Sequence, residues 1–160
     1  MLAASAYEIV LAVHIMAVVI AFGVTFAYPI MFAVAGRADP RALPTMHRVE
    51  YTTERFLVNG GLLVVVAAGI YLASKGHLWS QFFVQWGLGA AVVIGALAGA
   101  VMIPTAKRAE QAAARDIEAA GDGEVALGAE YQALVRRLGI VGSSLSLLVL
   151  ATIAIMVIQP

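Results

Sequence analysis

The sequence contains no cysteine among its 160 residues, and only 12% of the residues are charged. Without cysteine the chain can form no disulfide, thiolate nucleophile, zinc–thiolate site or cysteine-held iron–sulfur cluster. Ten Lys and Arg residues balance ten Asp and Glu residues, so no net positive charge is available to attract nucleic acid. Motifs such as GxxxxGK(S/T), GxSxG and HExxH are also missing. These absences exclude nucleic-acid binding at first pass and argue against a nucleotide-driven or hydrolytic enzyme.

What the chain does contain is apolar sequence. Hydrophobic residues make up 62% of it and the mean hydropathy is +0.91, which lies outside the range of soluble domains. Charged residues divide the chain into four apolar blocks, because an ionised side chain is costly in hydrocarbon. A helix of roughly 20 residues crosses about 30 Å of hydrocarbon. We therefore predict membrane-spanning helices at residues 9–36, 56–74, 78–106 and 138–160.

These spans predict an all-α fold with one membrane domain, residues 1–160, built as an up-and-down four-helix bundle. Residues 107–137 are too polar to span but rich in helix-forming residues, and Gly121-Asp122-Gly123 is a turn signal. We expect a helical hairpin there, between the third and fourth spans. Pro40 and Pro44 indicate a loop after the first span, and Pro104 should perturb the third helix.

The distribution of Lys and Arg predicts the orientation. Nine of the ten basic residues lie in the connections after the first and third spans, and only Lys75 lies on the other side. By the positive-inside rule these two connections, including the hairpin, are cytoplasmic and both termini are outside. The residues before Ile9 include no Lys or Arg, which disfavours a cleaved signal peptide. We expect a multi-pass protein of the bacterial inner membrane.

His14 is the first candidate for chemistry, because an ionisable side chain within a span is a functional-site hypothesis by default. Helical periodicity predicts that it shares an inward-facing stripe with residues three and four positions apart, namely Tyr7, Leu11, Val18, Ala21, Thr25, Tyr28 and Phe32. Matching depths on the other helices place four further residues near it: Tyr71, Gln85, Thr152 and Met156. A structural reading also stands, in which a neutral His14 donates to Tyr71, Gln85 or a backbone carbonyl and holds helices together.

The functional reading of His14 is a ligand for haem b or for a metal ion such as copper. His47 is predicted on the opposite side of the membrane, roughly 30 Å away, so it cannot be the second ligand. Three residues could supply the second ligand: Met156, His77 if the outer loop folds inward, or His14 of another subunit. Alternatively, the iron has no second protein ligand.

A second polar cluster lies where the second span begins. His47, Glu50 and Glu54 share one helical face by their spacing. We expect a solvated face with internal ion pairs; the alternative is a metal site, although no other span supplies a matching Glu-x-x-His pair.

Two further sets of residues complete the predicted interior. Polar residues that would line a path through the bundle are Thr25, Tyr28, Asn59, Ser143 and Ser146. Small residues on one ridge of the third span, suited to close helix packing, are Gly87, Ala91, Gly95 and Gly99. That ridge fits packing inside one bundle or a seam between subunits.

Three segments of the chain resemble an uncharacterised family of predicted bacterial four-helix integral membrane proteins. They are residues 11–17 (LAVHIMA), residues 48–55 leading to Gly69-Ile70-Tyr71-Leu72, and Arg136-Arg137-Leu138-Gly139 before a helix that ends in Gln159-Pro160. More distantly, the chain resembles copper-resistance D-like proteins and four-helix membrane protoporphyrinogen oxidases. The distant resemblance implies a haem or copper ligand at the helix-one histidine, which here is His14.

The sequence therefore predicts a non-enzymatic membrane binding protein that holds haem or a metal ion at His14. A small transporter or channel subunit, and a structural subunit of a membrane complex, are the alternatives. In each case we expect a homo-oligomer or a larger membrane assembly in the lipid bilayer.

Overall fold

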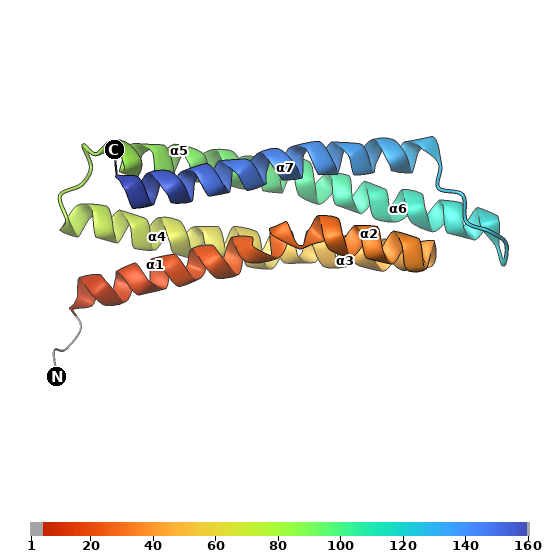
Figure 1. Cartoon of the computed structure of the whole chain (residues 1–160), viewed down its shortest axis with the longest axis horizontal. Coiled ribbons are helices and arrows are strands. Elements are labelled where there is room, and N and C mark those ends of the chain that lie inside the picture. The colour runs from red at the N-terminus through yellow and green to blue at the C-terminus, as the bar shows by residue number, and fades with distance from the viewer. Residues whose placement is uncertain (1–4, 160) are drawn as a thin grey trace.

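The computed structural model describes residues 5–159, which form long helices joined by short turns (Figure 1). In chain order the elements are α1 (Ala6–Gly23), η1 (Val24–Phe26), α2 (Tyr28–Ala38), η2 (Pro40–Ala42), α3 (Leu43–Thr53), η3 (Glu54–Val58), α4 (Asn59–Lys75), α5 (Phe82–Leu97), η4 (Ala98–Met102), α6 (Ile103–Ala120) and α7 (Ala129–Ile158). The described residues include no β-strand. The predicted all-α fold is confirmed.

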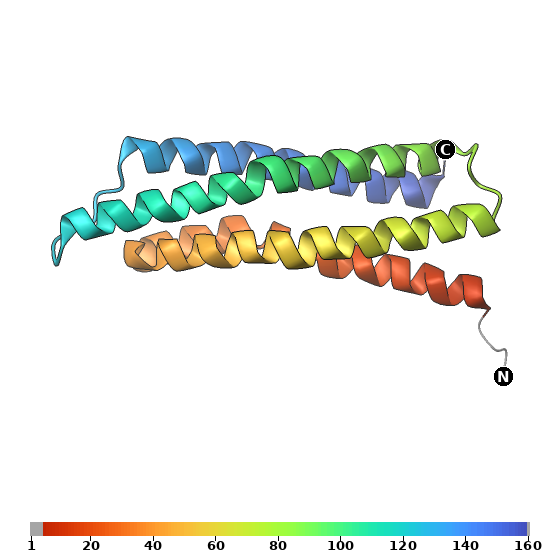
Figure 2. The same ribbon diagram turned by 180° about the vertical axis from the view of Figure 1, so that it is seen from behind.

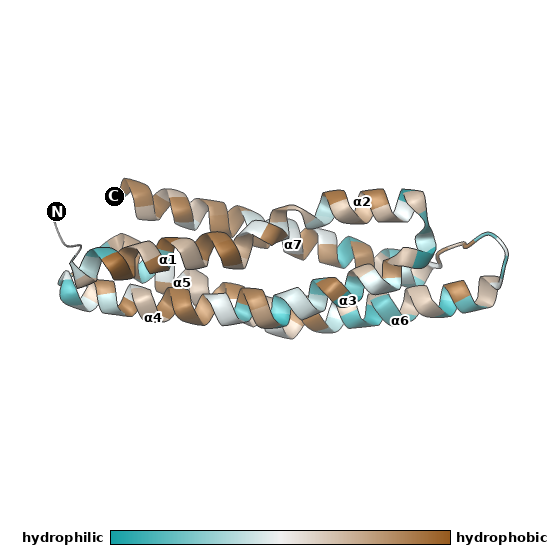
Figure 3. Ribbon diagram, turned by 90° about the horizontal axis from the view of Figure 1, so that it is seen from below, coloured by the Kyte–Doolittle hydropathy of each residue, from teal (hydrophilic) through white to brown (hydrophobic). Residues whose placement is uncertain are grey.

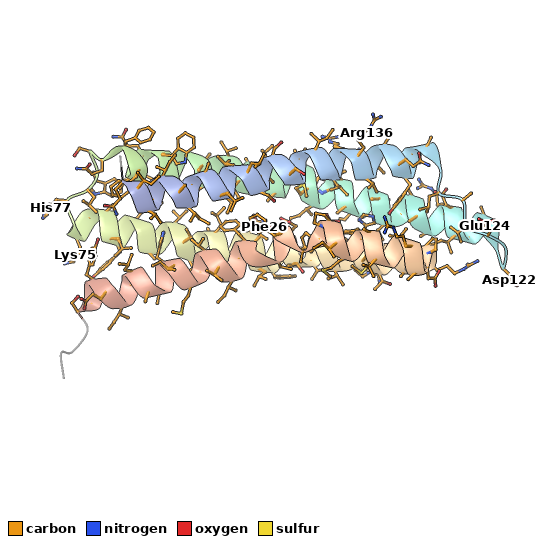
Figure 4. All side chains as sticks on the ribbon, in the orientation of Figure 1. Phe26, Lys75, His77, Asp122, Glu124 and Arg136 are labelled. Atoms are coloured by element: carbon orange, nitrogen blue, oxygen red, sulfur yellow. The ribbon has the colours of Figure 1, made fainter. Side chains whose placement is uncertain are left out.

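The helices run up and down along one long axis (Figures 1 and 2). The start of α1, the α4–α5 connection and the end of α7 lie at one end of the bundle, and the α6–α7 turn lies at the other. Figure 4 shows Lys75 and His77 at the first end and Asp122 and Glu124 at the second. Helix α4 packs against α1, α3 packs against α6, and α7 packs against both α5 and α6.

Local chemistry explains several helix ends. Ser5 caps α1 through a capping box, in which its hydroxyl accepts from the Glu8 N–H and the Glu8 carboxylate accepts from the Ser5 N–H at 2.8 Å. Gly121 ends α6 with a φ of +55°, a conformation that favours glycine. The guanidinium of Arg41 donates to the carbonyls of Gly121 and Gly123 at 2.7 and 2.9 Å, which ties the two connections at this end together.

Two prolines lie next to departures from α geometry. Pro29 has no N–H for the carbonyl four residues before it, and the chain forms the 3₁₀ turn η1 just ahead of it. Pro104 lies in the first turn of α6, directly after the π-helical segment η4. The perturbation predicted near Pro104 is therefore present, and it takes the form of a wider helical turn rather than a break.

The helices are longer than the predicted spans. Four helices, at residues 6–38, 40–75, 82–120 and 129–158, are long and apolar enough to cross a membrane. Residues 78–81, which were expected within the third span, form a turn before α5 instead. The hairpin predicted at residues 107–137 has helical arms, but its second arm begins at Ala129 because Gly121, Gly123 and Gly128 fall between the arms.

The outer surface suits lipid. Large apolar side chains are exposed on all four long helices; Val19, Leu63, Val92 and Val157, for example, are 64%, 73%, 72% and 77% exposed. Figure 3 shows hydrophobic residues dominating α1, α4 and α5, with hydrophilic residues more frequent along α3 and α6. Apolar surface on this scale is costly in water, so a bilayer is its natural environment.

Candidate cofactor site

His14 lies on α1 and makes one hydrogen bond, between its Nδ1 atom and the backbone carbonyl of Val65 on α4, at 2.9 Å. A carbonyl can only accept, so Nδ1 carries the proton and donates. In the neutral ring Nε2 then has a free lone pair. Histidines that bind metals usually have this arrangement, in which one nitrogen is fixed by a backbone or carboxylate acceptor and the other is free to ligate.

Gly69 makes room for the ring. A Cβ atom at Gly69 would lie 3.4 Å from His14 Cε1 and 3.7 Å from its Nδ1, so the imidazole lies directly on this face of α4. Two turns earlier, a Cβ atom at Gly61 would lie 2.5 Å from the Cβ atom of Ala21 on α1. The ridge formed by Gly61, Val65 and Gly69 therefore brings α4 close enough to α1 to hold His14 in place.

A cavity of about 420 Å³ adjoins His14 and is bounded by α1, α4, α5 and α7. Its walls are mostly apolar. The potential ligand groups that line it with His14 are the Met156 thioether, the Tyr7 phenol and, less suited, the Thr152 hydroxyl and the Gln159 amide. Thr152 is engaged already, because it accepts from Trp86 Nε1 at 3.1 Å and donates to the Leu148 carbonyl at 2.8 Å. Met156 and Tyr7 are thus the better-suited further groups for a ligand in this cavity.

The other predicted neighbours of His14 lie elsewhere. Gln85 is exposed and its amide donates to the Trp79 carbonyl at 3.4 Å. His77 is exposed in the α4–α5 connection, and Tyr71 is half-buried outside the lining of the cavity. Of the inward-facing stripe predicted on the first helix, all members except Leu11 are buried or half-buried.

The small residues of the third span face different neighbours. Gly87 packs against the Met156 side chain of α7, and a Cβ atom at Gly95 would lie 3.1 Å from Leu62 of α4. Ala91 lines the His14 cavity, whereas Gly99 is exposed with open space around it. Gly87 and Gly95 therefore serve packing inside the bundle, and association with a second subunit stays a prediction.

The predicted polar interior gathers in a second cavity, of about 850 Å³, between α2, α3 and α7. Thr25, Tyr28, Ser143 and Ser146 line it, and Asn59 does not. We call it the α2–α7 groove. Its residues His47, Glu50, Glu54 and Tyr131 form a polar cluster.

The expectation of a solvated face at residues 47–54 is wrong, because this cluster is buried. His47, Glu50 and Glu54 are only 1%, 4% and 4% exposed. His47 Nδ1 lies 2.9 Å from Glu50 Oε2, and His47 Nε2 lies 3.2 Å from the Tyr131 hydroxyl. Spacing predicted their common face, but Phe32 and Tyr131, whose rings lie 4.6 and 5.7 Å from that of His47, cover it from other helices. Among residues 5–159, no three His, Asp or Glu side chains are arranged to hold a metal ion.

Four helices that are long and apolar enough to cross a membrane, with large apolar side chains exposed on their surface, define a multi-pass integral membrane protein. The family model described as "Predicted integral membrane protein (DUF2269)" matches residues 8–160. The chain belongs to this family, which is uncharacterised, in agreement with the family resemblance of the sequence. No curated protein and no solved structure matches the chain.

Proposed function

We propose that this integral membrane protein binds haem, or failing that a metal ion, through Nε2 of His14. The observation that supports the proposal is the hydrogen bond from His14 Nδ1 to Val65, which leaves Nε2 free beside a cavity that also contains the Met156 thioether. Histidine and methionine together are a known axial pair for haem iron. Bound haem would supply redox or ligand-binding chemistry; His14 would bind its iron, and Val65 and Gly69 would hold the His14 ring in position.

Haem is favoured over a lone ion on two grounds. A cavity of about 420 Å³ with apolar walls is of the size that takes organic cofactors and ligands. A lone divalent ion would need more protein ligands than one imidazole and one thioether.

Replacing His14 with Ala tests this function. We expect purified parent protein in mild detergent to take up added haemin with a saturable Soret change, and the H14A variant to bind it at least about tenfold more weakly. H77A is the matched control, because His77 is exposed and outside the cavity. Circular dichroism verifies that both variants stay helical, and metal analysis of the same samples detects copper. Equal haemin and copper binding by H14A and the parent would contradict the proposal.

A transporter subunit is the second candidate, favoured by the placement of the two cavities end to end. Phe22, Ile94 and Val149 line both cavities and are buried. This apolar layer separates the His14 cavity from the α2–α7 groove, so a continuous path would require these three side chains to move apart.

We further propose that the chain lies in a bacterial inner membrane with both termini outside, because nine of its ten basic residues fall in residues 37–55 and 107–137, the segments toward the α6–α7 turn (Figure 1).

The absence of cysteine makes this orientation straightforward to test. We expect Ser80→Cys, in the α4–α5 connection, to react with a membrane-impermeant maleimide in intact cells. Asp122→Cys, in the α6–α7 turn, should react only after permeabilisation. The cysteine-free parent gives the background, and labelling of Asp122→Cys alone in intact cells would reverse the orientation.

A further inference from the structure

Of the two acidic groups in the α2–α7 groove, Glu50 is paired with His47, and Glu54 has no cationic partner among residues 5–159. Glu50 and Glu54 line it, and no Lys or Arg does. The nearby cations are engaged outside it: Arg48 pairs with Glu110 at 2.6 Å, and Lys107 lies over the ring of Tyr51 at 5.3 Å. Carboxyl groups that are withdrawn from water without a paired cation favour the entry of a positive charge.

Two buried residues of the groove carry polar groups that have no hydrogen-bond partner among residues 5–159. Glu54, 4% exposed, makes no hydrogen bond or ion pair, in contrast to Glu50, which is bonded to His47. The hydroxyl of Tyr28, a residue 7% exposed, also makes no hydrogen bond; Thr53 lies near it without the required geometry. Tyr28, Glu50 and Glu54 all line the groove. Buried polar groups are normally satisfied, so the unpartnered Tyr28 hydroxyl, together with the unpaired Glu54 carboxyl group, indicates a ligand that supplies donors.

The size and lining of the groove identify the kind of cation. A volume of about 850 Å³ suits an organic molecule, whereas a small ion needs a close set of ligands that the described residues do not provide. The rings of Phe32 and Tyr131 add faces that attract organic cations, and Leu43, Met102 and Leu138 add an apolar wall. An ammonium group has three N–H donors, which can serve two carboxylates and one hydroxyl.

We propose that the α2–α7 groove binds a primary organic ammonium ion with an apolar tail, its nitrogen held by Glu54, Glu50 and the Tyr28 hydroxyl. The site is separate from His14 and does not depend on haem binding. Glu54 supplies the unpaired charge, His47 positions Glu50, and the apolar wall takes the tail.

The test is direct binding of 2-phenylethylammonium to the full chain in an uncharged maltoside detergent. Isothermal titration calorimetry measures this binding. We expect saturable binding of this amine, and none of 2-phenylethanol at the same concentration, because the alcohol has the same ring without the charge. Failure of the amine to bind folded protein, or equal binding of the alcohol, would overturn the proposal.

Two variants locate the site. Glu54→Gln should weaken amine binding about tenfold, because a charge-assisted bond is lost with little change of shape. Tyr28→Phe should weaken it about threefold, yet leave the unfolding temperature unchanged or raised, because it removes a hydroxyl that has no partner in the free protein. If Tyr28 had only a structural role, Tyr28→Phe would not lower the affinity for the amine in a protein that is still folded. Glu118→Gln, an exposed carboxyl outside the groove, is the matched control. Unchanged affinity in both test variants would refute the site.

The ammonium group could belong to a free amine or to a lipid headgroup, and a competition arm distinguishes them. If the groove binds the lipid headgroup, phosphatidylethanolamine added to the micelles should compete with 2-phenylethylammonium. The apparent Kd of the parent protein for 2-phenylethylammonium should then rise. An unchanged Kd assigns the groove to free amines. Either result supports the ammonium site, since both require the amine to bind first.

Discussion

His47→Ala is expected to destabilise the bundle by about 3–5 kcal/mol, the effect of breaking a buried hydrogen-bonded pair by removing one partner. The His47 ring is 1% exposed and bonds both Glu50 of its own helix and Tyr131 of α7. Without it the Glu50 carboxylate loses its only hydrogen-bond partner among the described residues, and the contact with the Phe32 ring at 4.6 Å is lost. Unfolding by a denaturing detergent in mixed micelles, followed by circular dichroism, measures the change.

A double-mutant cycle separates the buried pair from the loss of packing. Adding Glu50→Gln to His47→Ala should recover part of the lost stability, because a neutral amide is less costly to leave buried than a carboxylate. His77→Ala provides a comparison at an exposed histidine and should leave stability unchanged. If His47→Ala is as stable as the parent, the polar cluster does not contribute to the fold.

The four-helix fold could be predicted from the sequence because its main signals are local. Charged residues that cannot enter hydrocarbon bound each apolar block, and this alone fixes the number and rough position of the helices. The start of α7 at Ala129 was less accessible to prediction. The helices continue beyond the apolar blocks into the polar residues of the hairpin arms. In these polar segments hydropathy does not indicate where a helix begins or ends.

The inward face of the first helix was also predictable, since 3.6-residue periodicity fixes which side chains share a face. The partners of His14 were not. Matching depth along the bundle placed Gln85 beside it, but depth says nothing about rotation of α5 about its own axis, and Gln85 is exposed. Val65 was not predicted because its role uses only a backbone carbonyl, which leaves no mark on residue type.

A sequence signal for the true contact face of α4 does exist. Gly61 and Gly69 lie eight residues apart with Val65 between them, a spacing that places all three on one side of a helix. The ridge predicted from the sequence was instead that of the small residues in the third span. Small residues favour close helix packing on both the α4 ridge and the ridge of the third span. Only the packed structure shows that α1 lies against Gly61 and Gly69.

Gly61→Ala should therefore destabilise the bundle by about 1–3 kcal/mol, the usual effect of overpacking, although alanine is the better helix former. Its new Cβ would lie 2.5 Å from Ala21 Cβ and 3.3 Å from Ala21 Cα, so α1 must move away. Gly60→Ala is the matched control at the adjacent position. A Cβ there meets nothing within 4 Å, so this variant should be stabilised by up to about 1 kcal/mol.

The opposite signs of these neighbouring substitutions identify close approach of α1, rather than glycine itself, as the cause. Ala21→Gly removes the atom that the new Cβ meets, so the pair Gly61→Ala with Ala21→Gly should recover much of the loss. Because the same ridge holds His14 against Val65 and Gly69, Gly61→Ala should also weaken haemin binding, and Gly60→Ala should not. Loss of stability without loss of haemin affinity would mean that the cofactor is bound elsewhere than at His14.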